Sequence, residues 1–363
     1  MKQKLWHFIR VICLIAGLVL AVIGVMYLGD LHREAFPRFY GAGRERSILP
    51  GLLAGMLFLL TPLAVAGAGR LCKHRVTQSC IAFVHIVWGK GIRLGRPCFG
   101  TAMLPPRLDG SSPFVLPMLS TSLYSLCLSG LFLLLSLLLW KTAEVETLLF
   151  IALFFFVLAL TQCLPRADGT DVLSRVWRMR RSPDLVRAWE CATHINDALA
   201  DGKTLPDMPD AWFQTYPAEL AEDVYVSNCM INGSSRLIRR ERYGEAYEML
   251  RPLFNLKPAP HTHRVIACAV LNGAVCEAMN DLPPMCLEQL DHHSVKYMTP
   301  SNWQSRMELA RYARALLHHN EAEAAEILSG LEKLLEQNDA DRTTLIRLQR
   351  KTGVTPQAGG DTP

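Results

Sequence analysis

The residue types that could do chemistry gather at two places in the chain. Asp168 follows a long apolar run and precedes Gly169, in the stretch LPRADGTD at residues 164–171. Earlier, a short basic segment carries two cysteines and two histidines: Cys72, His74, Cys80 and His85. Thiolates, imidazoles and carboxylates are the ligands that proteins offer to zinc, and zinc with an open coordination position activates water for hydrolysis. Zinc binding is the chemistry that these residues would support if the fold brought them together.

Each of these residues also has an ordinary structural interpretation. Asp168, with Asp171 close by, precedes a helical pattern that begins at Val172. An aspartate there can cap the helix, a contribution of about 1 kcal/mol, and we favour a cap over a metal ligand. His85 lies in an alternating, strand-like stretch, and the segment has neither H-x-x-x-H nor C-x-x-C spacing. We therefore favour an interfacial or hydrogen-bonded role for His85 and keep a rebuilt zinc site with Asp168 as the alternative.

The remaining histidines and glycines do not predict another site. Adjacent histidines on a helix point about 100° apart, so the pairs His292-His293 and His318-His319 cannot chelate a metal alone. The chain has no G-x-S-x-G, no phosphate-binding G-x-x-x-x-G-K and no dinucleotide fingerprint. The stretch GKGIRLGR at residues 89–96 is best interpreted as a basic hairpin near lipid headgroups.

Composition separates the chain into an apolar and a charged part. Half of the 363 residues are hydrophobic and the formal charge is +5, while the mean hydropathy of +0.16 is high for a soluble protein. The basic residues flank apolar runs, which favours anionic lipids as partners and argues against nucleic acid. Eleven scattered cysteines do not form a disulfide framework, and we expect free thiols on a reducing side.

Four apolar runs in the first part are long enough to cross a membrane as helices: residues 8–28, 48–69, 114–140 and 145–164. Pro50 and Pro62 interrupt the second run. Between the second and third runs, CIAFVHIVW at residues 80–88 is strand-like and too short to span. The distribution of lysine and arginine predicts a multi-pass protein of the cell membrane with both termini in the cytoplasm.

The second part has the spacing of amphipathic helices. Ser182, Pro183 and Gly202 are the start and stop signals of its first long helix. Later segments indicate helical hairpins in which small residues pack against large ones, a pattern that resembles tetratricopeptide repeats. We expect a transmembrane domain at residues 1–170, an all-α cytoplasmic domain at 171–350 and a disordered tail at 351–363.

Several short motifs occur in a fixed order along most of the chain. The small-residue helix end PLAVAGAG at residues 62–69 precedes the strand-like segment. After it come LPPRLDG from Leu104 to Gly110, LPRADGT from Leu164 to Thr170, and ALADGKTLPDMPDAWF from Ala198 to Phe213. This order resembles a membrane branch of the site-2 protease family. The resemblance implies an intramembrane zinc metallopeptidase, in which a helical HExxH gives two histidine ligands and a glutamate base and a later Asp-Gly gives the third ligand.

The chain departs from that family where zinc would bind. The span that should carry HExxH has no histidine or glutamate, and its degenerate motif positions are Leu63, Ala64, Gly67 and Ala68. Asp168 is the surviving candidate ligand, and one carboxylate cannot hold catalytic zinc. We therefore expect an inactive homologue without a cofactor, which binds a transmembrane or cytoplasmic protein. The alternatives are an active zinc metallopeptidase with displaced ligands and a membrane-anchored helical-repeat adaptor.

Overall fold

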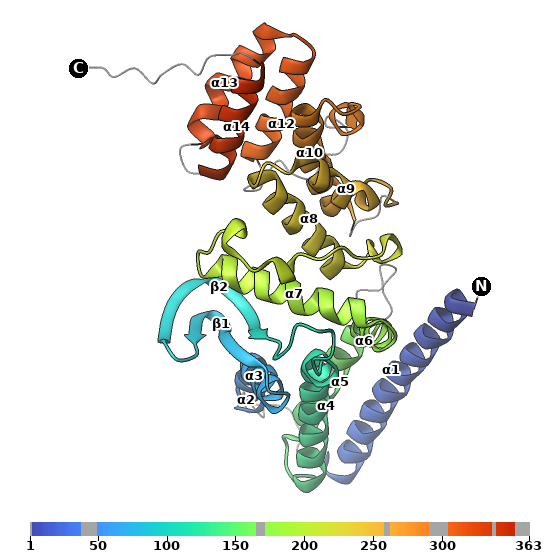
Figure 1. Ribbon diagram of the computed structural model, residues 1–363. Helices are drawn as coiled ribbons and strands as arrows, with labels where there is room; N and C mark the ends of the chain where they lie inside the picture. Colours follow the sequence, from blue (N-terminus) through green and yellow to red (C-terminus); the bar gives the residue numbers. More distant parts are fainter. Residues whose placement is uncertain are drawn as a thin grey trace. The chain divides into compact units, whose positions relative to one another are not determined.

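The computed structural model describes residues 2–37, 49–164, 171–257, 262–289, 304–335 and 339–352. The chain divides into two compact units, Met1–Val186 and Arg187–Pro363, with the boundary inside helix α7 (Pro183–Ala200). Most of both units is helical, and a single two-stranded sheet lies in the first unit among the described residues (Figure 1). The predicted combination of an apolar helical part, a small sheet and a charged helical part is confirmed at this level.

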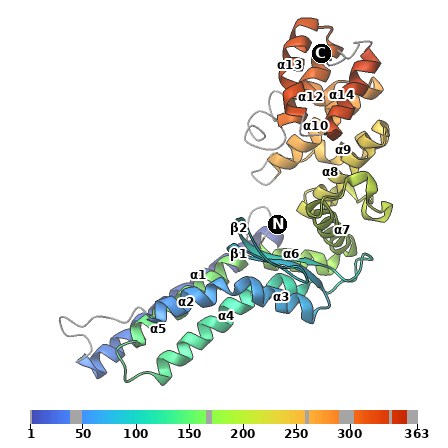
Figure 2. The same cartoon turned by 90° about the vertical axis from the view of Figure 1, so that its left-hand side faces the viewer.

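The two helices that best fit a membrane span are α4 (Val115–Leu138) and α5 (Val145–Cys163), close to the predicted third and fourth runs. They pack side by side (Figure 2). The rings of Phe132 and Phe155 are fully buried between them and stack with centroids 5.9 Å apart. Ser129 Oγ donates a hydrogen bond to the Ala152 carbonyl, 2.8 Å away. A small residue at Ala152 allows this close approach.

The predicted second run forms two helices, α2 (Leu49–Leu59) and α3 (Thr61–Leu71), which meet at a bend of 43°. Pro62 lacks an N–H and cannot continue the α2 hydrogen-bond ladder. Thr61 Oγ1 donates to the Phe58 carbonyl across the bend, at 2.6 Å. The pair makes a third candidate span among the described residues if it is counted as one helix.

The first apolar run lies within α1 (Lys2–Ala35), which packs against α5. Arg33 near the end of α1 forms an ion pair with Glu146, whose side chain is 4% exposed. The His32 ring is buried against Phe36 and Trp140. These contacts fix the end of α1 beside the start of α5.

The chain leaves the apolar helices through α6 (Val172–Arg181). Its N-cap is Asp171, whose Oδ1 accepts a hydrogen bond from Ser174 N at 2.8 Å. The predicted cap thus exists, but Asp171 provides it rather than Asp168, because a cap must lie directly before the first helical residue. Asp168 lies outside the described residues.

The second unit is built from helices that pack pairwise in chain order: α8 (Val224–Arg239), α9 (Tyr243–Phe254), α10 (His263–Asn280), α12 (Gln304–Leu317), α13 (Glu321–Leu335) and α14 (Asp339–Thr352). Its core includes the fully buried Ala246, Cys276, Tyr312 and Leu331. Before α8, short 3-10 turns occur at Leu205–Asp207, Asp210–Trp212 and Ala218–Leu220. Pro183 begins α7 as predicted, and Gly202 ends it in the left-handed region at φ +82°.

Every cysteine whose side chain is described is a free thiol. Five of them lie in the interior of the second unit: Cys191, Cys229, Cys268, Cys276 and Cys286. Burial raises the pKa of each of these thiols, to about 11 at Cys268. They therefore behave as small hydrophobic residues, as the sequence indicated.

Candidate functional site

The strongest candidate site is carried by a curled β-hairpin between α3 and α4. Strand β1 (Arg75–Val87) pairs antiparallel with β2 (Gly91–Leu104) across a tight turn with Gly89 at φ +83°. Residues 89–96, predicted as a basic hairpin, form the turn and the first part of β2 in this larger hairpin, and their nearness to lipid headgroups stays a prediction. Figure 1 shows that both strands bend strongly along their length. The bend is sharp enough for Trp88 N to donate a hydrogen bond to the Thr77 carbonyl, at 3.0 Å.

Two backbone irregularities produce this bend. Ala82 has a positive φ of 52°, which a residue with a β-carbon rarely adopts. The pairing is also irregular there, because Ala82 faces Cys98 while Val84 already faces Leu94. Three residues of β2 therefore lie opposite one of β1, an arrangement that kinks a strand and increases its twist.

The bend brings together two cysteines and a histidine. In a straight strand, Cys80 and His85 would be about 16 Å apart and would point to opposite faces. In the hairpin, Cys80 Sγ lies 3.7 Å from His85 Nδ1, and Cys98 Sγ lies 3.7 Å from His85 Nε2. One ligand atom from each of the three residues lies within 4.8 Å of the others. We call these three residues the hairpin cluster.

Neighbouring residues hold the imidazole of the hairpin cluster in place. Gln78 Nε2 lies 2.6 Å from His85 Nδ1 and donates to Cys80 Sγ at 3.0 Å. A β-carbon at Gly95 would lie 2.9 Å from His85 Cε1 and Nε2, so only glycine leaves room for the ring here. Cys80 is buried, His85 is half-buried and Cys98 is exposed. The cluster is thus fixed on one side and open to solvent on the other.

The electrostatic setting of the cluster keeps its inner thiol neutral. Burial raises the pKa of Cys80 to about 11, and the Cys98 thiol adds to this rise, while Gln78 and Arg93 oppose it. A buried thiol of this kind is inert toward electrophiles until a metal replaces its proton. The chemistry that the arrangement supports is therefore soft-metal binding by two sulfurs and an imidazole.

The structure places the other predicted site residues away from the cluster. His74 is 4% exposed, its Nδ1 lies 3.4 Å from Met103 Sδ, and burial lowers its pKa. Cys72 and His74 are not members of the hairpin cluster. Asp109 of the LPPRLDG motif is exposed and accepts hydrogen bonds from Ser111 N and Oγ. It closes a turn, and those bonds lower the pKa of its carboxyl.

Sequence reasoning named His85 and Cys80 but missed Cys98 and Gln78. Cys98 lies on β2, and its approach depends on the irregular pairing opposite Ala82. The sequence does contain one signal for Cys98, the glycine-rich turn at residues 89–96. A tight hairpin there places the residues after the turn alongside residues 80–88. This turn could have predicted that Cys98 lies near Cys80, but it does not predict the bend that brings His85 to the two cysteines.

A second feature is the helix that carries the degenerate motif positions. In α3, Leu63, Ala64 and Ala68 are half-buried and Gly67 is exposed. The helix packs on both strands and on α4. Gly69 is the point of closest approach, because a β-carbon there would lie 3.0 Å from Met103 Sδ. This packing uses the small residues of α3 as a backing for the hairpin.

Open space lies beside the small residues of α2 and α3. A β-carbon at Gly51, Gly55 or Gly67 would meet no atom within 4 Å. Gly51 and Gly55 are four residues apart in the apolar sequence LPGLLAGMLFL, so they lie on one face of α2. Leu52 and Met56 beside them are exposed by 59% and 66%. A glycine pair with this spacing lets a second apolar helix approach closely.

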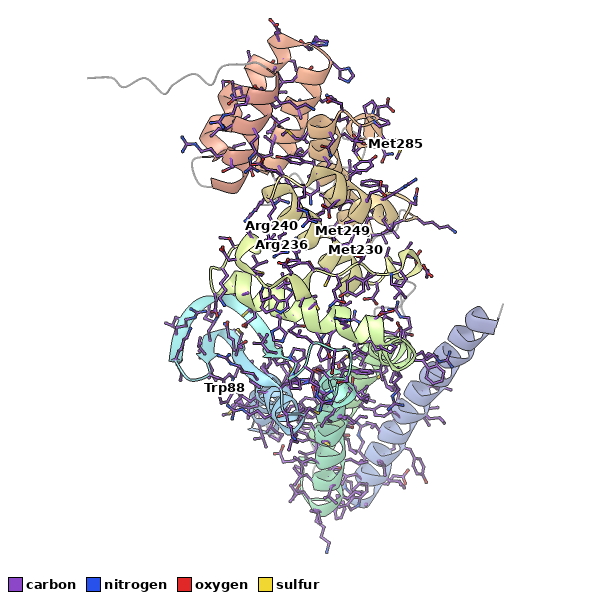
Figure 3. The ribbon with its side chains drawn as sticks, viewed as in Figure 1. Trp88, Met230, Arg236, Arg240, Met249 and Met285 are labelled. Atoms are coloured by element: carbon purple, nitrogen blue, oxygen red, sulfur yellow. The ribbon has the colours of Figure 1, made fainter. Side chains whose placement is uncertain are left out.

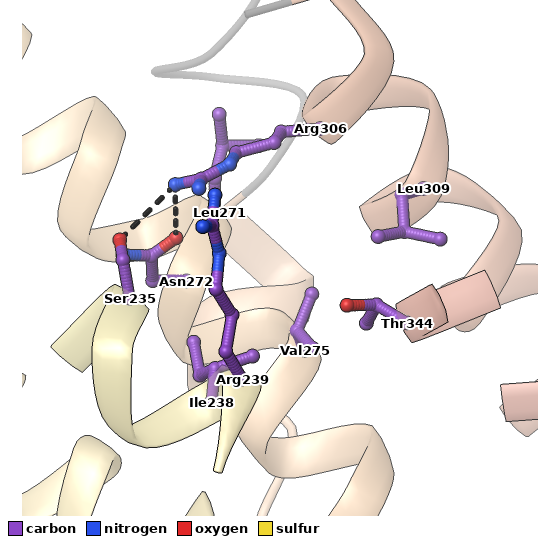
Figure 4. Close-up of a pocket in the computed structure, with 9 residues that line it drawn as sticks. All are labelled: Ser235, Ile238, Arg239, Leu271, Asn272, Val275, Arg306, Leu309 and Thr344. Atoms are coloured by element: carbon purple, nitrogen blue, oxygen red, sulfur yellow. Dashed lines mark hydrogen bonds between the residues drawn. The ribbon is translucent and has the colours of Figure 1, made fainter. Parts of the chain in front are cut away.

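The second unit contains a cavity of about 20 Å³, enough for one water molecule. Two arginine side chains, Arg239 and Arg306, point into it beside polar groups (Figure 4). Arg306 Nη1 donates to Ser235 Oγ at 3.2 Å and to Asn272 Oδ1 at 3.1 Å. Asn272 Nδ2 in turn donates to Ser235 Oγ at 3.0 Å. These bonds cross-link α8, α10 and α12, so we assign the cavity a structural role.

Another arginine of α8 anchors the loop that precedes it. Arg236 is 4% exposed and donates to the carbonyl oxygens of Leu205 and Met208, at 3.1 and 2.9 Å. It also pairs with Asp210, which Arg240 approaches to 3.4 Å. Figure 3 labels Arg236 and Arg240 close to each other on α8. The guanidinium lies 4.6 Å above the centre of the Phe213 ring. The loop at residues 204–213, which contains the end of the last sequence motif, is therefore a structural element.

Comparison of the chain with protein-family models gives no match. Curated proteins and solved structures give none either.

Proposed function

We propose that this chain is an integral membrane protein with a site-2-protease-like scaffold that has lost peptidase chemistry and works by binding another membrane protein. The observation that supports the proposal most directly is the character of α2 and α3. The motif positions Leu63, Ala64, Gly67 and Ala68 offer no metal ligand, while Gly51, Gly55 and Gly67 leave open space beside an apolar helix. A surface of this kind suits helix packing rather than hydrolysis.

The order of elements supports the same proposal. A small-residue helix end in α3 is followed by the hairpin, then by α4 and α5, as in the sequence order that resembles the protease family. The partner would be a transmembrane helix with small residues of its own, because close packing in lipid requires small side chains on both sides. We further propose four spans with both termini in the cytoplasm, and a tetratricopeptide-like helical unit that can contact a cytoplasmic partner. A reporter fused to the C-terminus checks the topology.

The binding proposal is tested by photo-crosslinking in the native membrane. A photoreactive residue at Met56 reports contacts of the open face of α2, and one at Leu138, which is 71% exposed on α4, reports background. We expect a crosslink to another membrane protein from Met56 that Gly55→Leu abolishes. The matched change Gly130→Leu, where a β-carbon also meets no atom within 4 Å, should leave it intact. Equal crosslinks from both positions, or insensitivity to Gly55→Leu, would contradict the proposal.

The same experiment separates binding from catalysis through Asp168→Ala. If the scaffold is inactive, Asp168→Ala should crosslink from Met56 as the wild-type chain does, and the partner protein should have the same length in both. If the crosslinked protein is shortened in cells with the wild-type chain and accumulates at full length with Asp168→Ala, the chain is an active metallopeptidase with displaced ligands. If crosslinks arise from the helical unit and none from α2, the membrane part is an anchor for an adaptor.

A further inference from the structure

We propose that Cys80, His85 and Cys98 bind one zinc ion on the hairpin, at a site separate from the zinc position that the family resemblance implies. The three residues belong to two strands and meet through the bend at Ala82. The three proposed ligands include no residue of α3 and do not include Asp168. The site is therefore independent of the proposed loss of peptidase chemistry, and either proposal can fail without the other.

The donor atoms of the hairpin cluster lie close enough together for one zinc ion to bring them into its coordination shell. Zn–S bonds of about 2.3 Å and Zn–N bonds of about 2.0 Å at tetrahedral angles place the donors about 3.5 to 3.8 Å apart. Cys80 Sγ lies 3.7 Å from His85 Nδ1 and Cys98 Sγ lies 3.7 Å from His85 Nε2, so each sulfur is at donor spacing from a different ring nitrogen. Taken as one ligand atom from each residue, the three donors lie within 4.8 Å of one another. Because a zinc ion binds only one nitrogen of an imidazole, the sulfur beside the other nitrogen must move toward the metal when zinc binds.

The donor set selects the kind of metal. Two thiolates and an imidazole are soft and borderline ligands that favour zinc over magnesium, calcium or manganese. Three protein ligands leave a fourth position for water, as in zinc sites with exchangeable ligands. Cys98 is exposed, so the fourth position faces solvent. Gln78 contacts both His85 and Cys80 and acts as a positioning residue for the ligands.

The hairpin also has the stiffness that a preformed site needs. Trp88 Nε1 donates to Ser79 Oγ at 3.1 Å, and the Arg70 guanidinium lies 4.0 Å above the centre of the Trp88 ring. The first contact holds the end of β1 near its beginning, and the second holds it against α3. The ligands are therefore brought together before metal binds, and little conformational entropy remains to be lost on binding.

The test uses the full-length protein, purified in detergent under anaerobic, reducing conditions and stripped of metal. Titration with Co²⁺ should give a sulfur-to-cobalt charge-transfer band that saturates at one equivalent and disappears when Zn²⁺ is added. We expect Cys98→Ser to remove the band and lower zinc affinity at least tenfold, because Cys98 is exposed and its loss should leave the fold intact. Cys72→Ser, a change of the same type outside the cluster, should behave as wild type.

Two further variants distinguish zinc binding at a site of defined geometry from nonspecific zinc binding by cysteine thiols. Gly95→Val removes no donor but pushes against the His85 ring, and should weaken zinc binding. Gln78→Leu should weaken it about 10- to 100-fold while keeping one equivalent of metal. In addition, Zn²⁺ should protect Cys98 from alkylation, measured by mass spectrometry, and leave the alkylation of Cys72 unchanged.

Several outcomes would overturn the zinc site. They are the absence of a charge-transfer band, equal affinity in wild type and Cys98→Ser, a Cys80–Cys98 disulfide in protein kept anaerobic, or binding of Cu⁺ without binding of Zn²⁺. None of these outcomes decides whether Met56 crosslinks to another membrane protein, so failure of the zinc site and failure of the proposed function remain distinguishable.

Discussion

Glu277 should be among the most important single residues for the stability of the helical unit. Its carboxylate is fully buried in α10 and accepts hydrogen bonds from the backbone N–H groups of Cys286, at 2.8 and 3.0 Å, and Leu287, at 3.0 Å. These N–H groups belong to the helical turn that begins at Met285 and would otherwise lack an acceptor. The Tyr247 hydroxyl donates a further bond at 3.2 Å.

The magnitude follows from the groups that lose an acceptor. Glu277→Ala leaves two backbone N–H groups and a hydroxyl without an acceptor, each at about 1–3 kcal/mol, so we expect a loss of about 3–5 kcal/mol in the free energy of unfolding. Glu277→Gln keeps one oxygen but places an N–H₂ group where the other oxygen stood, and should cost about 1.5–3 kcal/mol. A unit with a typical stability of about 5–15 kcal/mol would be strongly affected by the first change.

The assay is hydrogen exchange of the slowest amides of α8, read by mass spectrometry on the full chain in detergent. These amides report opening of the helical unit alone. A loss of 3–5 kcal/mol should accelerate their exchange by about two to four orders of magnitude. Glu248→Ala is the control, because Glu248 is 66% exposed and its pairing with Arg251 should matter little. Exchange in Glu277→Ala within a factor of ten of wild type would refute the reasoning.

Three other variants test the remaining structural arguments. Arg236→Ala should lower the stability of the helical unit by about 2–4 kcal/mol, because the Leu205 and Met208 carbonyls lose their buried donor. Chemical denaturation measures this loss of stability. Residues 204–213 should also become more sensitive to proteolysis. Asp223→Ala removes the N-cap of α8 and should cost about 1 kcal/mol in the same denaturation assay, whereas no change would mean that water replaces the cap. Phe132→Ala should destabilise the α4–α5 pair by about 3–5 kcal/mol, measured as a lower melting temperature in detergent, and an unchanged value would show that lipid or detergent fills the space.

Elements that depend on an average over many residues could be predicted from the sequence. The predicted third and fourth runs correspond to α4 and α5 within a few residues, because hydropathy over about twenty residues decides whether a helix suits a membrane. The prolines in residues 48–69 predicted an interruption, and the structure has a bend of 43° there. The angle itself depends on packing against α4 and the hairpin, which no local pattern records.

The hairpin cluster could not be predicted, because its geometry depends on backbone conformations that the residue types do not favour. Alanine at residue 82 gives no sign of a positive φ, yet that conformation lets His85 approach Cys80. Cys80 and His85 form neither the H-x-x-x-H nor the C-x-x-C spacing, so sequence reasoning favoured an interfacial histidine. The error at the cap of α6 was smaller: two aspartates were available, and a shift of three residues decides which one can bond to Ser174 N.

The hairpin connects the two proposals physically. Phe99 of β2 stacks on Phe58 of α2 with ring centroids 5.4 Å apart, and Thr101 Oγ1 donates to the Pro62 carbonyl at the start of α3. A metal ion bound by Cys98 would restrain the residue next to Phe99, and through it the bend between the two helices. Gly51 and Gly55, on which the partner helix would pack, lie in α2, the helix that Phe99 contacts through Phe58. Stiffening an element that both ligands contact makes the second binding event less costly in entropy, so zinc should increase crosslinking from Met56 if both sites exist.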